Sequence, residues 1–157
     1  MTNIGASFEQ TYRDVINTLA HMSTGPALID DTVPDSAETA LPDLDEALAA
    51  APAAGDLSGR WHGDVWKVVA ALALHHPELS LRTIVEVGNC QTLVWRRDAA
   101  SPVTPLDETT LDQIRDLRYE DVMASGIPEF FAGGSEDEVI AQCLSEIGPR
   151  AWIRSYS

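Results

Sequence analysis

Apolar residues recur every three or four positions near the start of the chain. The positions that follow this spacing are Phe8, Tyr12, Val15, Ile16, Leu19 and Met22. Such a period is typical of an amphipathic helix. Ser7 and Gln10 have the spacing of a capping box at its start, and Gly25-Pro26 ends it because proline cannot continue a helix. The pattern therefore predicts a helix over residues 7–23.

A second stretch, from His62 to His76, is apolar on almost every side. A helix with apolar residues all round is typically buried in the centre of a domain. We therefore expect the central helix of the fold here, with Pro77 at its end. The longest purely apolar run within it, residues 68–74, is too short to span a bilayer.

Two runs rich in β-branched and aromatic residues, 81–87 and 90–96, flank the dipeptide Gly88-Asn89. Such residues favour strands, and a Gly-Asn pair between them is typical of a two-residue hairpin turn. That turn fixes a register in which the following residues face one another: Val87 and Cys90, Val85 and Thr92, Thr83 and Val94, Glu86 and Gln91, Ile84 and Leu93, and Arg82 and Trp95. The last pair has the composition of a cation stacked on a ring.

Helical spacing returns after Pro105, with inner positions at Leu111, Ile114, Leu117 and Val122. We expect one helix over 105–125, ended by Ser125-Gly126. Another capping box, Ser135 with Glu138, opens a last helix that Gly148-Pro149 ends. The tail, residues 151–156, alternates in the manner of a final strand.

Residues 26–58 are rich in proline, alanine and aspartate and have no sustained period. We expect a long connection with one short helix over 41–51. A hairpin alone is only marginally stable, so it must pack on the helices. The chain therefore predicts a single α+β domain over 1–157, with four to five helices on a small, mostly antiparallel sheet built on the Gly88-Asn89 hairpin.

The chain has 157 residues with 25 acidic and 10 basic side chains, a formal net charge of -15. That charge repels a phosphate backbone and an anionic bilayer, so we expect no direct binding of nucleic acid or membrane. The start of the chain lacks the basic and apolar parts of a secretory signal, and two cysteines make no disulfide framework. A cytoplasmic location follows as the expectation. The excess of arginine over lysine is typical of a GC-rich bacterial genome, whose proteins can be acidic, so origin is an alternative cause of the charge.

Within the predicted helix 105–125, four acidic residues follow one another in steps of four. They are Glu108, Asp112, Asp116 and Glu120. On a helix they form one stripe, each residue about 6 Å beyond the last, and like charges at this spacing repel. The stripe indicates a docking face for a partner rich in arginine and lysine. The alternative is a solvated face that Arg115 and Arg118 partly neutralise.

The two adjacent rings Phe130 and Phe131, between Pro128 and Gly133, offer an apolar anchor for the same partner. The alternative is that they pack in the core.

Enzymatic chemistry has weaker support in the sequence. No zinc spacing, phosphate-binding loop or nucleophile elbow is present. The rival interpretation is a small enzyme or ligand-binding domain with a pocket beside the hairpin. Its candidate residues are His62, Asp64, Glu86 and Cys90. The central helix separates His62 from His76 by roughly 20 Å, so we expect no metal site and no cofactor there.

The leading interpretation is a non-enzymatic acidic module that binds or inhibits a basic protein, in the manner of an immunity protein, an antitoxin or a nucleic-acid mimic. This is an analogy of class, since physical properties and not a motif support it. A third interpretation is a homodimer formed through a strand edge. Salt dependence of binding separates the first from the other two.

Overall fold

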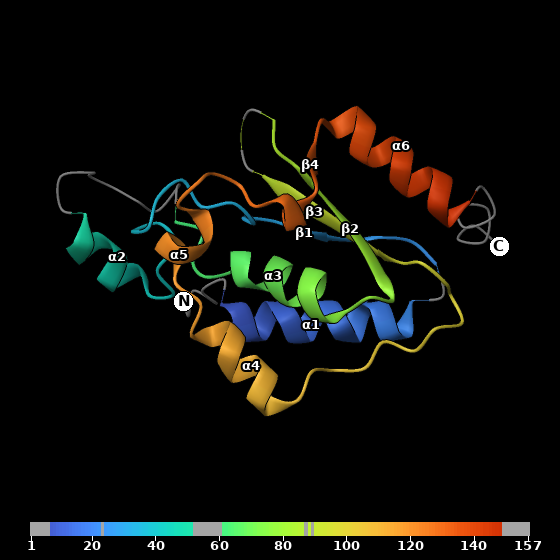
Figure 1. Cartoon of the computed structure of the whole chain (residues 1–157), viewed down its shortest axis with the longest axis horizontal. Coiled ribbons are helices and arrows are strands. Elements are labelled where there is room, and N and C mark those ends of the chain that lie inside the picture. The colour runs from blue at the N-terminus through green and yellow to red at the C-terminus, as the bar shows by residue number, and fades with distance from the viewer. Residues whose placement is uncertain (1–6, 23, 52–60, 87, 89, 149–157) are drawn as a thin grey trace, which may run out of the picture.

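The computed structural model describes residues 7–22, 24–51, 61–86, 88 and 90–148. Within these residues six α-helices and one short 3₁₀ helix pack with a four-stranded mixed sheet (Figure 1). This arrangement confirms the α+β class that the sequence predicts. The helices exceed the expected four to five because the stretch 105–125 folds as two helices rather than one.

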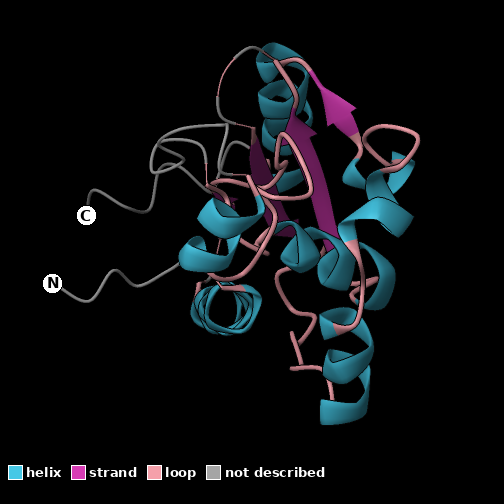
Figure 2. Cartoon of the chain, turned by 90° about the vertical axis from the view of Figure 1, so that its left-hand side faces the viewer, coloured by secondary structure: helices cyan, strands magenta, loops and turns pink. Residues whose placement is uncertain are grey.

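The sheet has the order β1-β3-β2-β4. Its strands are β1 (Ala27–Ile29), β2 (Leu79–Ile84), β3 (Gln91–Arg96) and β4 (Gly133–Gly134). β1 and β2 flank β3 antiparallel, and β4 pairs with β2 in parallel. Figure 2 shows the strands in magenta among the surrounding helices. The sequence did not predict β1 or β4, because two or three residues are too few to show a period of two.

The hairpin register differs from the predicted one by two residues. Thr83 lies opposite Thr92 rather than Val94, and Arg82 lies opposite Leu93 rather than Trp95. The paired segments end at Ile84 and resume at Gln91, so the connection is longer than a two-residue turn. A shift of two leaves every side chain on its predicted face.

Buried hydroxyl groups give a physical reason for this register. The Thr83 and Thr92 side-chain oxygens lie 2.8 Å apart, and Thr92 donates onward to Thr32 at 3.0 Å. All three residues are fully buried, and a buried hydroxyl without a partner is costly. Placing Thr83 opposite Thr92 satisfies these groups together, and Thr32 donates in turn to the carbonyl oxygen of Cys90.

Helices cover both faces of the sheet. Helices α1 (Phe8–His21) and α3 (Trp66–His75) lie below it in Figure 1, and α6 (Glu136–Ile147) lies above it. The main core forms where α1 and α3 meet the sheet, with Phe8, Ile16, Leu19, Val68, Leu72 and Val94 among its members. Helix α3 is buried along most of its length, which confirms the predicted central helix.

The single helix predicted over 105–125 is wrong. The chain forms α4 (Glu108–Arg115) and α5 (Tyr119–Met123), with an extended backbone at Arg118 between them. The break lets the two helices reach different parts of the interior. Ile114 packs in the main core, whereas Met123 packs in a second cluster with Trp66 and Phe131.

The connection 26–58 contains β1 and then α2 (Leu44–Ala50), where the sequence predicted one short helix over 41–51. Asp43 caps α2, since its carboxylate accepts the main-chain N–H of Glu46 at 2.9 Å. The 3₁₀ helix η2 (Glu129–Phe131) leads into β4. None of the helices in the described ranges is both long and apolar enough to cross a membrane.

The two predicted capping boxes have different outcomes. Ser135 and Glu138 form a complete box at the start of α6, as predicted. Ser7 makes no capping bond to α1; the carboxylate of Asp64 accepts the N–H of Phe8 at 2.7 Å instead. A carboxylate from the start of the central helix therefore replaces the local cap. The strand predicted over 151–156 lies outside the described residues.

Candidate functional site

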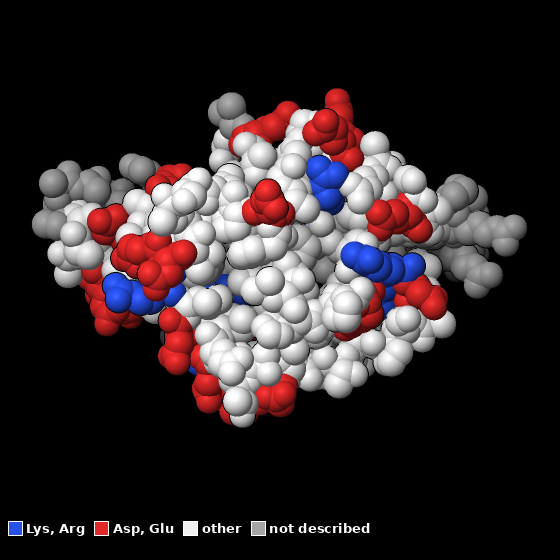
Figure 3. Space-filling view, in the orientation of Figure 1, with Lys and Arg blue, Asp and Glu red and all other residues white. Residues whose placement is uncertain are grey.

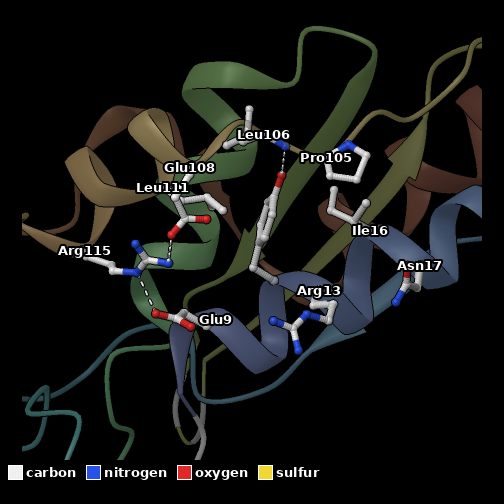
Figure 4. A pocket seen from close by; sticks show the side chains of 10 residues that line it. Glu9, Arg13, Ile16, Asn17, Pro105, Leu106, Glu108, Leu111 and Arg115 are labelled. Atoms are coloured by element: carbon white, nitrogen blue, oxygen red, sulfur yellow. Dashed lines mark hydrogen bonds and ion pairs between the residues drawn. The ribbon is translucent and has the colours of Figure 1, made fainter.

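The predicted acidic stripe is divided between two helices, and the carboxylates of its first half are paired with an arginine. The Arg115 guanidinium bonds Glu108 at 2.8 Å and Glu9 at 2.6 Å (Figure 4), and it also contacts Asp112. The hydrogen bonds of Glu108 and Glu9 raise the pKa of Arg115. Glu108 and Asp112 therefore face the protein's own arginine.

The second half of the stripe lies beyond the helix break. Asp116 caps the carboxyl end of α4, and Glu120 lies in the first turn of α5. Glu120 approaches Arg118 at 3.8 Å, and both side chains are more than half exposed. A pair this long and this exposed holds its partners weakly. Glu120 therefore remains open to an outside cation.

Glu120 belongs to a group of carboxylates that act on one phenol. Burial raises the pKa of Tyr119, and Asp35, Glu38 and Glu120 raise it further. We call Asp35, Glu38 and Glu120 the acidic surface. Acidic side chains also gather over α2 and α5 at the left-hand end of the molecule (Figure 3). Of the predicted stripe, only Glu120 belongs to this group.

Aromatic side chains flank this acidic surface. Phe131 is fully buried in the second cluster, so it is not available as a surface anchor. Phe130 is only half-buried, with its ring 5.1 Å from that of Phe131. Tyr119 packs against the same cluster and donates to the carbonyl of Pro34 at 3.3 Å. Phe130 is therefore the one of the two predicted anchors that a partner can reach.

A pocket of about 310 Å³ lies between α1 and the segment that leads into α4 (Figure 4). Its charged lining residues are Glu9, Arg13, Glu108 and Arg115. Its apolar lining is formed by Ile16, Pro105, Leu106 and Leu111, and Tyr12 also lines it. The volume is at the low end of the range for ligand pockets.

The hydroxyl of Tyr12 is fully used within the protein. It accepts the N–H of Leu106 at 2.9 Å and lies 2.9 Å from Nε2 of His76, whose Nδ1 lies 2.7 Å from Glu78. One set of protons satisfies the chain if Tyr12 donates to His76 and His76 donates to Glu78. Burial raises the pKa of Tyr12. The Tyr12 hydroxyl that lines the pocket is therefore engaged within the protein.

A second groove, of about 370 Å³, runs between α1 and the outer edge of β1. Its α1 side includes Thr11, Asp14 and Thr18. Its strand side includes Leu28, Asp30 and Asp31. The sequence did not predict this groove, because β1 itself was expected to be part of a connection.

The four residues proposed for a pocket beside the hairpin are engaged in different places. Asp64 caps α1, and Glu86 accepts the N–H of Glu136 at 3.1 Å, at the start of α6. His62 is buried and its main-chain N–H donates to the carbonyl of Thr39, but its side-chain Nδ1 has no hydrogen-bond partner within the described part of the chain. Asp64 and Glu86 thus have structural partners, whereas the His62 side chain has none at Nδ1.

Cys90 is only partly buried. Burial raises the pKa of its thiol, and the negative charge of Asp35 raises it further. A raised pKa reduces the thiolate fraction that nucleophilic chemistry needs. Cys143 is buried in the interior, as the sequence predicted.

Arg82 holds separate elements together, whereas the sequence predicted that it stacks on Trp95. Its guanidinium donates to the carbonyl of Ala132 at 2.8 Å and to the side chain of Gln142. It thereby joins β2 to the segment before β4 and to α6. Its partner residues are fifty or more positions away in the sequence. A local sequence pattern cannot predict contacts at that separation.

Among the described residues, no group of three histidine, cysteine or carboxylate side chains is arranged to hold a metal ion. No protein-family model matches the chain, and no curated protein or solved structure is found to be similar to it. Physical features of the surface are therefore the basis for any functional proposal.

Proposed function

We propose that this protein is a non-enzymatic acidic module that binds a basic protein, with the acidic surface of Asp35, Glu38 and Glu120 as its recognition face. The observation that carries the proposal is the gathering of carboxylates around Tyr119. Burial raises the pKa of this phenol, and all three carboxylates raise it further. The Tyr119 hydroxyl donates to the carbonyl of Pro34, the residue before Asp35.

The proposal moves the recognition face away from the first half of the stripe. Glu108 and Asp112 share Arg115 with Glu9, so a partner's cation would have to compete with an existing one. Glu120 has only the distant contact to Arg118. Asp116, exposed at the end of α4, extends the negative charge toward α5.

An apolar contact beside the charges gives the surface the composition of a binding site. Phe130 is half-buried against the second cluster, and Ile127 is 43% exposed nearby in the chain. Aromatic residues at the centre of an interface supply much of its affinity, whereas surrounding charges mainly set the association rate and the choice of partner. In this proposal Phe130 is the anchor and the carboxylates steer the partner to it.

Equilibrium binding of an arginine-rich peptide tests the proposal, with a peptide that carries glutamine at each arginine as comparison. The surface variant D35N/E38Q/E120Q removes three carboxylates. The control variant D98N/E136Q/D137N removes the same number near the end of β3 and at the start of α6. Exposed ion pairs contribute about 0.2–1 kcal/mol each, so we expect the surface variant to bind the peptide about tenfold more weakly at low salt.

The control variant has the same net charge as the surface variant, and we expect it to bind nearly as well as wild type. Circular dichroism of both variants confirms that they are folded. Equal loss in the two variants would mean that total charge, and not this surface, determines binding. Binding of the glutamine peptide as tight as that of the arginine peptide would also contradict the proposal.

A further inference from the structure

The outer edge of β1 is an unpaired sheet edge within the described part of the chain. β1 pairs with β3 on one side and is the end strand of the sheet. The main-chain N–H and C=O groups on the other side of an edge strand can pair with another strand. No described residue pairs with that side of β1.

The surroundings of this edge are shaped to receive a chain. The groove of about 370 Å³ runs beside β1, with Thr11 and Thr18 of α1 along its other wall. Ala27 and Ile29 point into the core, whereas Leu28 points to the opposite face and is 59% exposed. A strand laid along β1 would find hydrogen-bonding groups at the edge and an apolar side chain beside it.

The negative charge around the groove favours a strand that carries basic side chains. Asp14 lines it from α1, and Asp30 and Asp31 line it directly after β1. These carboxylates complement lysine and arginine side chains. A second copy of this chain would bring the same three aspartates and a net charge of -15 against its own kind, and like charges across an interface are unfavourable.

We propose that the outer edge of β1 binds an extended basic segment of the partner protein as a fifth strand of the sheet. Main-chain hydrogen bonds to β1 hold the segment, Leu28 contacts its apolar residues, and Asp14, Asp30 and Asp31 face its lysines or arginines. The inference rests on the proposed function for the chemistry of the partner. It adds the element that receives the partner and the conformation in which the partner binds.

Nuclear magnetic resonance titration with short peptides tests the proposal. The probe is a capped peptide in which lysine alternates with valine and threonine. A second peptide has the same side chains but carries N-methyl groups on alternate residues, which blocks the hydrogen bonds of one edge and keeps the charge. We expect the first peptide to shift the amide signals of residues 27–31 and to slow their hydrogen exchange. We expect the N-methylated peptide to bind at least tenfold more weakly.

A pair of variants tests whether the groove carboxylates contribute to peptide affinity. D14N/D31N removes two groove carboxylates, and asparagine accepts the left-handed backbone that Asp31 has at φ 58. D98N/D137N removes two carboxylates elsewhere. We expect the groove variant to lose affinity for the lysine peptide about tenfold, and the control variant to bind as wild type does.

The outcomes separate this inference from the proposed function. Equal binding of both peptides, with signals shifted only around α5, would overturn the β1 proposal and leave the acidic surface as the site. Failure of every basic peptide to bind would overturn both. Sedimentation of the protein alone as a dimer, with the same slowed exchange at residues 27–31, would show that a second copy occupies the edge and would also overturn the inference.

Discussion

At the scale of single residues, buried polar groups link parts of the chain that are far apart in sequence. Tyr12, His76 and Glu78 form one hydrogen-bonded chain that also holds Leu106, and Asp64 caps a helix that begins 56 residues earlier. Spacing predicted which apolar residues of α1 are buried, and the all-round apolar run predicted a buried α3, although Leu74 near its end is 56% exposed. The sequence did not predict these polar contacts, because each needs a partner that only the fold brings near.

The Tyr12 hydroxyl is the centre of this chain, so its removal should be costly. The change Tyr12→Phe leaves the Leu106 N–H and a His76 nitrogen without their partner. An unsatisfied buried group costs about 1–3 kcal/mol, and we expect a loss in that range in urea unfolding.

Tyr119→Phe is the matched control for this substitution. Its hydroxyl makes a single longer bond, 3.3 Å to the carbonyl of Pro34, so we expect a smaller loss of unfolding free energy. Equal losses in the two variants would mean that the Tyr12 hydroxyl has no special structural role.

At the scale of elements, one of the two predicted capping boxes forms, whereas the helix predicted over 105–125 is divided in two. Ser135 and Glu138 cap α6 as their spacing predicts. The period over 105–125 continues across residues 116–118, yet the helix breaks there, and Ile114 and Met123 pack in different clusters. The acidic stripe depended on an unbroken helix, so its prediction was wrong in geometry. The hairpin was located correctly, but the buried threonines set its register.

Helix α6 is attached to the sheet partly through Glu146, and this contact depends on pH. Hydrogen bonds from Gln142 and from the buried Trp95 lower the pKa of this carboxyl group. A group with a lowered pKa in the folded state contributes stability above its unfolded pKa, near 4.3, and loses that contribution as the pH falls through the folded value.

The variant Glu146→Gln keeps an acceptor oxygen but no charge. We expect it to be less stable than wild type at neutral pH, with a difference that shrinks below about pH 4.3 as wild-type Glu146 takes up its proton. Urea unfolding of both proteins across this range measures the difference. A gap that stays constant from neutral to acidic pH would mean that the carboxylate charge does not hold α6.

At the scale of the whole molecule, charge is the dominant feature. A net charge of -15 on 157 residues opposes folding through self-repulsion. Arg115 relieves this repulsion at one place by holding three carboxylates. The carboxylates around Tyr119 and along the β1 groove are the ones to which we assign a role in binding. Composition predicts the total charge, but only the fold shows which carboxylates share a cation.

The most direct test of the central claim is the association rate of the arginine-rich peptide, measured by stopped flow at two salt concentrations. The Debye length falls from about 30 Å at 0.01 M to about 8 Å at 0.15 M, so steering by the acidic surface should weaken strongly. We expect the wild-type rate to fall by about tenfold or more, and the D35N/E38Q/E120Q variant to be slower and less sensitive to salt than the D98N/E136Q/D137N control. Rates that do not change with salt, or that are the same in the two variants, would contradict the account.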